Sequence, residues 1–163
     1  MFGIAILTVS TSGYQGQRED TSGKTIQKIL CEPEYQTIHY SIIPDIQDTI
    51  AKQMIDWSDD PTVDLIVSTG GTGLGRQDVT PEACLSVIDK EVPGLAEAMR
   101  AKSLEITPMA MLSRSVCGVR GNTLIITLPG SPKGVRETLS VIQPVLPHAL
   151  ELLTQASVNE HPV

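Results

Sequence analysis

The stretch VDLIVSTGGTGLGRQDVTPEA, residues 63–83, changes its pattern twice. Its first part, Val63–Thr69, is a short apolar and β-branched run, which is typical of a buried strand. Four closely spaced glycines then allow the backbone to turn sharply and to approach a ligand closely. Thr80 and Pro81 predict a helix start, with Thr80 as the N-cap and Pro81 in the first turn. The predicted order is therefore strand, glycine loop and helix N-terminus.

A helix N-terminus that follows glycines is a favourable place for a phosphate, because its backbone N–H groups are free. The same loop carries a carboxylate, Asp78, which would repel a phosphate unless a cation lay between the two. Mg²⁺ is typically held by one or two carboxylates together with phosphate oxygens, so Asp78 suggests a magnesium site. The alternative is that Asp78 only stabilises the turn before the helix, since aspartate is common in turns.

The composition fits a single globular domain. The chain has 163 residues, of which 40% are hydrophobic, and this is enough for one substantial core. A net charge of −7 and an aromatic content of 3% argue against nucleic-acid binding, which needs basic faces and stacking platforms. No apolar run is long enough to cross a bilayer, and the first residues lack the pattern of a signal peptide. We therefore expect a cytoplasmic protein with neither a nucleic-acid nor a membrane partner.

The cysteines and histidines do not predict a metal or covalent site. Cys31, Cys84 and Cys117 are too widely spaced for a zinc pattern, and we expect all three to be buried, reduced thiols. His39 and His148 have no metal-ligand spacing and are expected to be structural residues of a strand and a helix.

Four apolar segments alternate with helical stretches, which is typical of an α/β domain with a mostly parallel sheet. The strands are predicted at Gly3–Val9, Thr37–Ile43, Val63–Thr69 and Thr123–Leu128. The helices are predicted at Thr21–Leu30, Ile46–Trp57, Pro81–Lys90 and, as one long helix, Pro132–Leu153.

The region between the third and fourth strands is less regular. It predicts a helix over Leu95–Glu105, a turn around Pro108 and a strand over Ser115–Val119 that pairs antiparallel with the fourth strand. Residues 1–153 are thus expected to form one domain, followed by a polar tail over residues 154–163.

Ligands of open α/β sheets bind outside the carboxyl ends of the strands. Asp45 follows the second predicted strand, and Ser131 and Lys133 follow the fourth. Asp45 and Ser131 are each well explained as helix N-caps, and Lys133 as a solvated surface residue. A lysine in a first helical turn opposes the helix dipole, however, and this favours an anionic partner near Lys133.

Four segments of the sequence together are much more specific than any of these residues alone. They are GGTGLGRQDVTPEA, VPGLAEAMR, TPMAMLSRSVCGVRGNTLII and LPGSPKGVRE. In combination they resemble the molybdenum-cofactor biosynthesis family, and most closely its molybdopterin adenylyltransferase branch, which includes MogA, the plant Cnx G domain and the gephyrin G domain. The resemblance runs from about Gly3 to Leu153.

This resemblance implies a Rossmann-like, three-layer α/β/α domain whose mostly parallel sheet has one antiparallel strand, assembled as a homotrimer. The implied reaction is Mg²⁺- and ATP-dependent transfer of AMP to the terminal phosphate of molybdopterin, which gives adenylyl-molybdopterin and pyrophosphate. Handover of the product to a molybdate-insertion protein is also implied. The alternative is a non-catalytic molybdopterin-binding or scaffold domain of the same family.

The family's site residues carry over to positions that match its motifs. The resemblance implies that Asp45 and Asp78 are catalytic and hold the metal. It places the nucleotide at Gly70, Gly71, Thr72, Gly73 and Thr80, and molybdopterin at Ser103, Ser113, Ser131 and Lys133. One position departs from the pattern, because many members have an aspartate where this chain has Thr11, whereas Asp20 in the same loop is retained.

Overall fold

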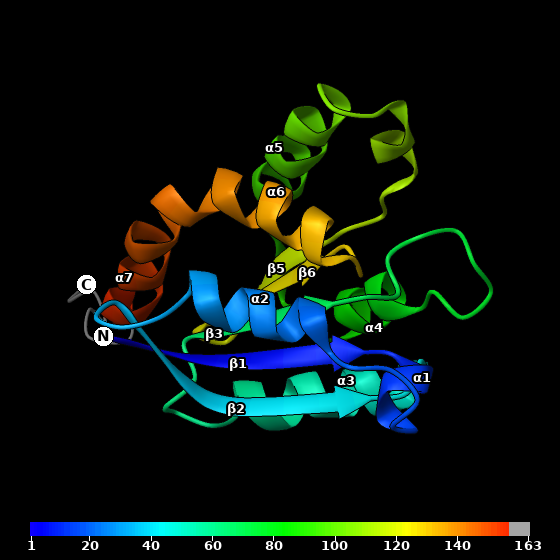
Figure 1. The fold of residues 1–163 in the computed structure, drawn as a ribbon. Helices are drawn as coiled ribbons and strands as arrows, with labels where there is room; N and C mark the ends of the chain where they lie inside the picture. Colours follow the sequence, from blue (N-terminus) through cyan, green and yellow to red (C-terminus); the bar gives the residue numbers. More distant parts are fainter. Residues whose placement is uncertain (157–163) are drawn as a thin grey trace.

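A six-stranded sheet forms the middle layer of the structure, a computed structural model that describes residues 1–156 (Figure 1). The strands lie in the order β2-β1-β3-β6-β5-β4. Strands β1, β2, β3 and β6 are parallel, whereas β5 runs antiparallel to both of its neighbours, β6 and β4. Their bounds are β1 Phe2–Val9, β2 Tyr35–Ile43, β3 Leu65–Thr69, β4 Lys90–Glu91, β5 Cys117–Arg120 and β6 Thr123–Leu128. The predicted mostly parallel sheet with one antiparallel strand is confirmed.

Helices cover both faces of the sheet and complete the three layers (Figure 1). Residues on β1 alternate between the faces, as the two-residue period of a strand requires. Ile4 and Ile6 belong to one apolar cluster, and Ala5 and Leu7 belong to the other. The first cluster contains α2 (Thr21–Ile29), α5 (Pro93–Leu104), α6 (Pro132–Ile142) and α7 (Leu146–Ala156), and the second contains α3 (Gln47–Ser58) and α4 (Thr80–Val87).

The central strands are nearly continuous apolar runs because both of their faces are covered. Every residue of β3 and of β6 is buried. The parallel strands β1, β2, β3 and β6 therefore end at one edge of the sheet, where the chain leaves the core. The loops that we predicted to bind ligands, which follow these four strands, therefore lie at this edge.

The long helix predicted over Pro132–Leu153 is wrong in one respect, because it is broken in the middle. Helix α6 ends at Ile142, a 3-10 turn spans Gln143–Val145, and α7 then begins in a new direction. Pro144 explains the break, since proline has no N–H to donate and its ring clashes with the preceding helical turn. Helix α7 continues to Ala156, so the first three residues of the predicted tail are helical, and residues 157–163 lie outside the described part of the chain.

Several short elements were not predicted. Helix α1 (Thr11–Tyr14) and strand β4 are two of them. The turn expected around Pro108 is present, and it has the form of a 3-10 helix, η1, over Pro108–Leu112. Helix α4 ends at Val87, earlier than predicted, because Ile88 is extended and leads into β4. None of the helices within residues 1–156 has both the length and the apolar character that a membrane crossing requires.

Two of the three cysteines are buried as predicted, and one is not. Burial raises the pKa of the Cys84 and Cys117 thiols to about 12, so both stay protonated near neutral pH. Cys31 is exposed, which contradicts the expectation of three buried thiols. His39 lies on β2, stacked on Trp57 with ring centroids 5.6 Å apart, and its Nε2 is 2.8 Å from an Asp60 carboxylate oxygen.

The close approach of β1 to the loop before β3 generates a stability prediction. A Cβ atom on Gly3 would lie 1.8 Å from the carbonyl oxygen of Thr62, whereas one on Gly94 would meet nothing within 4 Å. We expect Gly3→Ala to lower the free energy of unfolding by about 3 kcal/mol, at the upper end of the usual range for overpacking. Gly94→Ala, in the first turn of α5, should leave it unchanged or raise it slightly. Urea denaturation of both variants tests this, and equal stabilities would contradict it.

Candidate functional site

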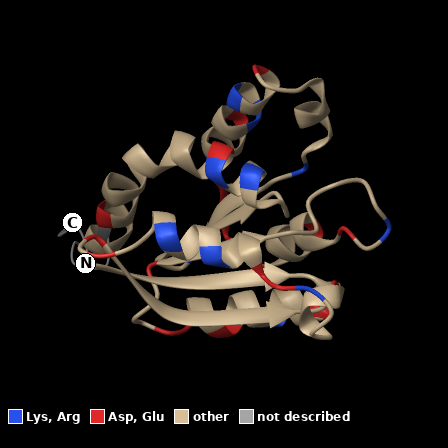
Figure 2. Cartoon of the chain, viewed as in Figure 1, with Lys and Arg blue, Asp and Glu red and all other residues tan. Residues whose placement is uncertain are grey.

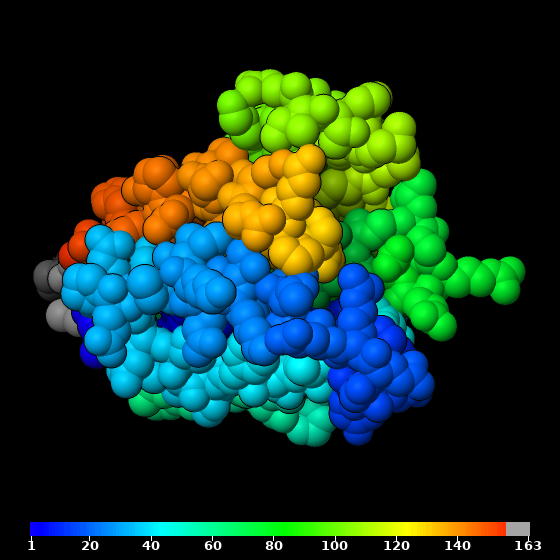
Figure 3. Space-filling model, viewed as in Figure 1, coloured from blue at the N-terminus to red at the C-terminus, as the bar shows by residue number. Residues whose placement is uncertain are grey.

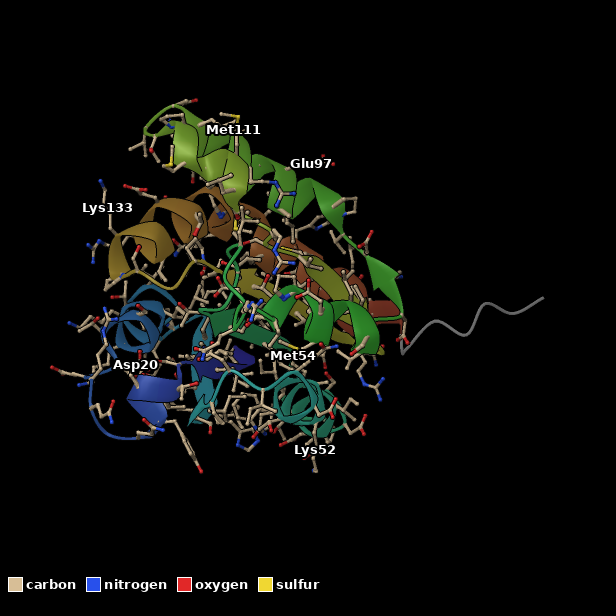
Figure 4. All side chains as sticks on the ribbon, turned by 90° about the vertical axis from the view of Figure 1, so that its right-hand side faces the viewer. Asp20, Lys52, Met54, Glu97, Met111 and Lys133 are labelled. Atoms are coloured by element: carbon tan, nitrogen blue, oxygen red, sulfur yellow. The ribbon has the colours of Figure 1, made fainter. Side chains whose placement is uncertain are left out.

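The loops after the four parallel strands line a pocket of about 660 Å³ at the carboxyl edge of the sheet. Figure 4 looks onto this edge, with Asp20 at the beginning of α2 and Lys133 above it at the beginning of α6. The lining includes residues 8–13 at the end of β1 and just after it, Asp45 after β2, residues 69–71 at the end of β3 and Asp78 beyond them, and Gly130 and Ser131 after β6. We call this cavity the first pocket. It brings together both predicted acids and the first two glycines of the loop.

Asp45 is not the N-cap of α3, as its position before the helix had suggested. Ile46 is the N-cap residue, and it makes no side-chain capping bond. The Asp45 Oδ2 atom instead accepts hydrogen bonds from the backbone N–H and the hydroxyl of Thr11, each at 2.8 Å. The Thr11 hydroxyl also accepts from the Asp45 N–H at 3.1 Å. Thr11, which departs from the family pattern, thus fixes the orientation of Asp45.

Asp78 has the turn-stabilising role that its sequence position left open as the alternative to a metal ligand. Its Oδ2 atom accepts a hydrogen bond from the Gly75 N–H at 2.8 Å, and its own N–H donates to the Gly75 carbonyl at 3.0 Å, so it does close a turn. Its Oδ1 atom accepts no hydrogen bond from residues 1–156, and the same is true of Asp45 Oδ1. Each acid therefore has one oxygen held by the protein and one available to a ligand.

Hydrogen bonds from Thr80, the first residue of α4, hold the glycine loop in place. Gly70 and Gly71 have φ values of 99° and 67°, a region that L-residues other than glycine rarely adopt. The Thr80 hydroxyl donates to the Gly70 carbonyl at 2.8 Å, and the Thr80 N–H donates to the Gly71 carbonyl at 3.1 Å. Val79, and not Thr80, is the N-cap of α4, so the predicted cap is wrong.

Thr80 has a relative exposure of 0% and lines neither pocket. A side chain without exposed surface has no atom to offer a ligand, and its hydroxyl is already bonded to the loop. The structure thus shows Thr80 shaping the glycine loop, and any part that it takes in nucleotide binding acts through that loop.

A second pocket, of about 530 Å³, adjoins the first and has a more apolar wall. All four residues predicted for molybdopterin line it: Ser103 on α5, Ser113 after η1, and Ser131 and Lys133 at the beginning of α6. Ser131 lines both pockets. Thr72 and Gly73, predicted for the nucleotide, line the second pocket and not the first, so the glycine loop runs from one pocket into the other.

Ser131 and Asp20 hold the beginnings of two helices at this edge. Ser131 is the N-cap of α6, as predicted, and accepts a hydrogen bond from the Gly134 N–H at 3.0 Å. Asp20 caps α2 through the Gly23 N–H at 2.8 Å, and it also accepts from the hydroxyls of Thr8 and Tyr40. Burial and the bond to Asp20 raise the pKa of Tyr40, so its phenol stays a donor. These three hydrogen bonds give Asp20 a structural role at this edge.

The charges of the two pockets differ in sign. Four carboxylates and one guanidinium line the first pocket, from Glu19, Asp20, Asp45, Asp78 and Arg18. Arg100 and Lys133 against Glu137 leave the second pocket with a net positive charge. Figure 2 shows basic residues (blue) at the beginning of α6 and on α5. An anion would enter the second pocket unaided, but it would need a cation in the first.

Sequence reasoning missed Arg18 and Arg100, which line the first and second pockets respectively. Arg18 is exposed in the loop before α2, and the Arg100 guanidinium donates to the Ser115 carbonyl at 2.9 Å. Arg100 ends one of the four segments that resemble the family, whereas Arg18 lies outside all four, and neither is adjacent to a glycine or a strand end. No signal in the single sequence separates them from ordinary surface arginines.

Comparison with known proteins agrees with this geometry. The model of a family described as "probable molybdopterin binding domain" matches residues 5–148. A molybdopterin adenylyltransferase of Helicobacter pylori strain J99 is 43% identical over 161 residues, which cover 96% of this chain and 92% of that protein. The Drosophila melanogaster molybdenum cofactor synthesis protein cinnamon is 40% identical, and the match covers 92% of this chain and 25% of that longer protein.

Solved structures support the same relationship. The molybdopterin biosynthesis enzyme MoaB of Thermus thermophilus superposes with a TM-score of 0.89 at 51% sequence identity, covering 95% of this chain and 98% of that one. A structure of MogA superposes with a TM-score of 0.88 at 39% identity, covering 93% of this chain and 99% of that one. The chain therefore belongs to the molybdopterin-binding domain family of molybdenum-cofactor biosynthesis.

Proposed function

We propose that this protein is a molybdopterin adenylyltransferase, which transfers AMP from ATP to the terminal phosphate of molybdopterin and releases pyrophosphate. The observation that carries the proposal is the pair of adjoining pockets that share Ser131 and are joined by the glycine loop. A transferase of this kind must hold two phosphorylated substrates side by side, with their reacting phosphates in contact. Membership of the family and the names of its relatives support the choice of substrates.

The first pocket suits the triphosphate of ATP together with a cation. The backbone of Gly70 and Gly71 lies open to it, and Arg18 provides one positive charge. The two acids fit Mg²⁺, because both line the first pocket and each has a carboxylate oxygen that accepts no hydrogen bond from residues 1–156. Mg²⁺ commonly has such incomplete protein coordination, with the rest supplied by phosphates and water. When bound, it would neutralise phosphate charge beside Asp45 and Asp78.

The second pocket suits molybdopterin. Met99, Ile106 and Leu112 give it apolar surface for a fused ring system, while Arg100 and Lys133 offer positive charge to the phosphate. Ser103 and Ser113 add hydroxyls that can orient polar ring edges. Ser131 lines both pockets, and this supports placing the meeting point of the molybdopterin phosphate and the α-phosphate of ATP beside it.

In the proposed step, an oxygen of the molybdopterin phosphate attacks the α-phosphorus of ATP. The new O–P bond forms as the bond from the α-phosphorus to the β-bridging oxygen breaks, and that electron pair leaves with pyrophosphate. The attacking oxygen is already ionised at neutral pH, because the second pKa of a phosphate monoester is about 6. The protein therefore needs no general base, and its contribution is positioning and charge neutralisation.

The alternative, a domain that binds molybdopterin without catalysis, needs the second pocket but has no use for two acids with free oxygens in the first. The experiment that separates the two supplies molybdopterin and α-labelled ATP with Mg²⁺ and looks for labelled adenylyl-molybdopterin. We expect equal amounts of this product and of pyrophosphate. Tight molybdopterin binding without any labelled product would favour the non-catalytic alternative.

Neutralising Asp78 tests its role directly. An asparagine keeps an oxygen that can accept from the Gly75 N–H, so Asp78→Asn should preserve the turn and leave the melting temperature nearly unchanged. We expect single-turnover AMP transfer to fall by about 100-fold or more, the order seen when one charge-stabilising group is lost from an active site. Asp48→Asn, in the exposed first turn of α3, is the matched control. Normal transfer in folded Asp78→Asn protein would refute the metal role.

The two pockets should respond separately to substitution. Ser113→Ala removes a hydroxyl from the second pocket and should weaken molybdopterin binding up to about tenfold, since one hydrogen bond contributes about 0.5–1.5 kcal/mol. Arg18→Gln should weaken ATP binding and spare molybdopterin. Gly71→Ala is unsuitable here, because its Cβ would lie 2.4 Å from the Thr80 hydroxyl. Calorimetric titration of both ligands gives four affinities, and a reversed pattern would show that the pockets are misassigned.

We propose further that the chain forms a homotrimer and passes its product to a molybdate-insertion protein, as the resemblance implies. On the 3-10 helix η1, Met111 is 68% exposed and lines neither pocket, so this apolar side chain is available for a subunit contact. Met111→Glu should then reduce the mass measured by light scattering at micromolar concentration, whereas Leu152→Glu on α7 should not. A wild-type chain that is monomeric under these conditions would refute the trimer.

A further inference from the structure

Arg114 lies beside both pockets but lines neither of them. Its Nε atom donates to the Gly73 carbonyl and its Nη2 atom donates to the Asp78 carbonyl, both at 2.7 Å. The guanidinium also forms an ion pair with Glu82 in the first turn of α4. One side chain therefore joins the two ends of the loop that carries Asp78 and ties that loop to a helix.

We propose that Arg114 is a positioning residue for the adenylyl transfer, which fixes the Asp78 carboxylate in the first pocket by closing the loop from Gly73 to Asp78. The inference rests on the proposed function of the first pocket. It adds to that function a residue that touches neither substrate and acts through the loop.

The loop has little else to hold it. Residues 74–77 are all exposed, and the segment between β3 and α4 projects from the molecule (Figure 3, green, right). Within residues 70–79, Gly75 and Asp78 are the only two residues that are hydrogen-bonded to each other. That local turn fixes the carboxylate relative to Gly75 but not relative to the sheet. The bonds from Arg114 connect Gly73 and Asp78, the two ends of the segment, to each other and to Glu82 on α4.

An arginine suits this task for a geometric reason. Its planar guanidinium presents five N–H donors in a fixed fork, so that it can bond two carbonyls and a carboxylate at the same time. The Glu82 carboxylate fixes the orientation of the fork, and its hydrogen bond with Arg114 lowers the pKa of Glu82, which therefore stays charged at neutral pH. A lysine would keep the charge but would offer one nitrogen in place of three.

The main chain of Arg114 connects the same loop to the second pocket. Its N–H donates to the Thr72 carbonyl at 2.9 Å, and its neighbours Ser113 and Ser115 both line that pocket. The Arg114 side chain fixes Asp78, while the backbone around it carries hydroxyls predicted to face molybdopterin. The residue thus sets the two substrate sites at a fixed distance from each other, as an in-line attack requires.

The test compares Arg114→Gln and Arg114→Lys with Arg120→Gln. Arg120 is a matched control, because its side chain is 29% exposed against 33% for Arg114, it pairs with an acid and a carbonyl, and it lines neither pocket. Four quantities are measured on each full-length variant: amide hydrogen exchange of residues 74–78, kcat, the KM for molybdopterin, and the Mg²⁺ concentration that gives half-maximal transfer. Melting curves confirm that each variant is folded.

We expect both Arg114 variants to exchange amides 74–78 faster and to need about tenfold more Mg²⁺, with kcat lowered by about 10–100-fold, as is typical when a residue that orients a metal ligand is removed. The KM for molybdopterin should change much less, because the backbone bond to Thr72 remains. Glu82→Gln should show a smaller effect in the same direction. If Arg114→Gln does not fold, Glu82→Gln can be used in its place to test the inference.

Two results would overturn the inference. One is exchange of amides 74–78 and a Mg²⁺ requirement in Arg114→Gln that match those of Arg120→Gln. The other is full activity of Arg114→Lys, which would show that charge alone suffices. A wild-type chain that transfers no AMP would instead overturn the proposed function, and the exchange measurement would still decide whether Arg114 closes the loop.

Discussion

The site depends on the close approach of the Gly70 backbone to the ends of two other strands. Its N–H donates to the Leu128 carbonyl at the end of β6, and a Cβ atom on it would lie 2.3 Å from the Val9 carbonyl at the end of β1. No other residue fits between these two backbones, and the φ of 99° adds the same requirement. This contact brings the loops after β1, β3 and β6 together at one place. The Thr80 hydroxyl, at the beginning of α4, stabilises the arrangement by its hydrogen bond to the Gly70 carbonyl.

The second organising feature is the opposite charge of the two pockets. Both proposed substrates are polyanions, and two polyanions repel each other unless each is separately neutralised. Free oxygens on Asp45 and Asp78 favour a metal-bound nucleotide on one side, while Arg100 and Lys133 favour a free phosphate on the other. Ser131 stands between them. Thr11 orients one acid directly, and Arg114 is proposed to orient the other through its loop.

Much of this arrangement could be predicted from the sequence, because strong local patterns determine it. Buried parallel strands contain nearly continuous apolar runs, as Leu65–Val67 and Leu124–Ile126 do, and glycines mark where the loop after Leu65–Thr69 turns. The break at Pro144 was also readable, but the apolar periodicity on both sides concealed it. The bonds of Thr11 to Asp45 and of Arg114 to Gly73 join residues 34 and 41 positions apart, and nothing local in the sequence marks such pairs.

The central claim is that two substrates occupy two adjoining pockets at the same time. It is tested most directly by titrating molybdopterin into protein saturated with Mg²⁺ and an ATP analogue whose α–β bridging oxygen is a methylene group, so that transfer cannot occur. Calorimetry reports the binding of molybdopterin, and a fluorescent form of the ATP analogue reports whether that analogue stays bound. We expect molybdopterin to bind at one equivalent per chain and to leave the ATP analogue in place. Displacement of the analogue in proportion to added molybdopterin would show that the ligands share one site, and would contradict it.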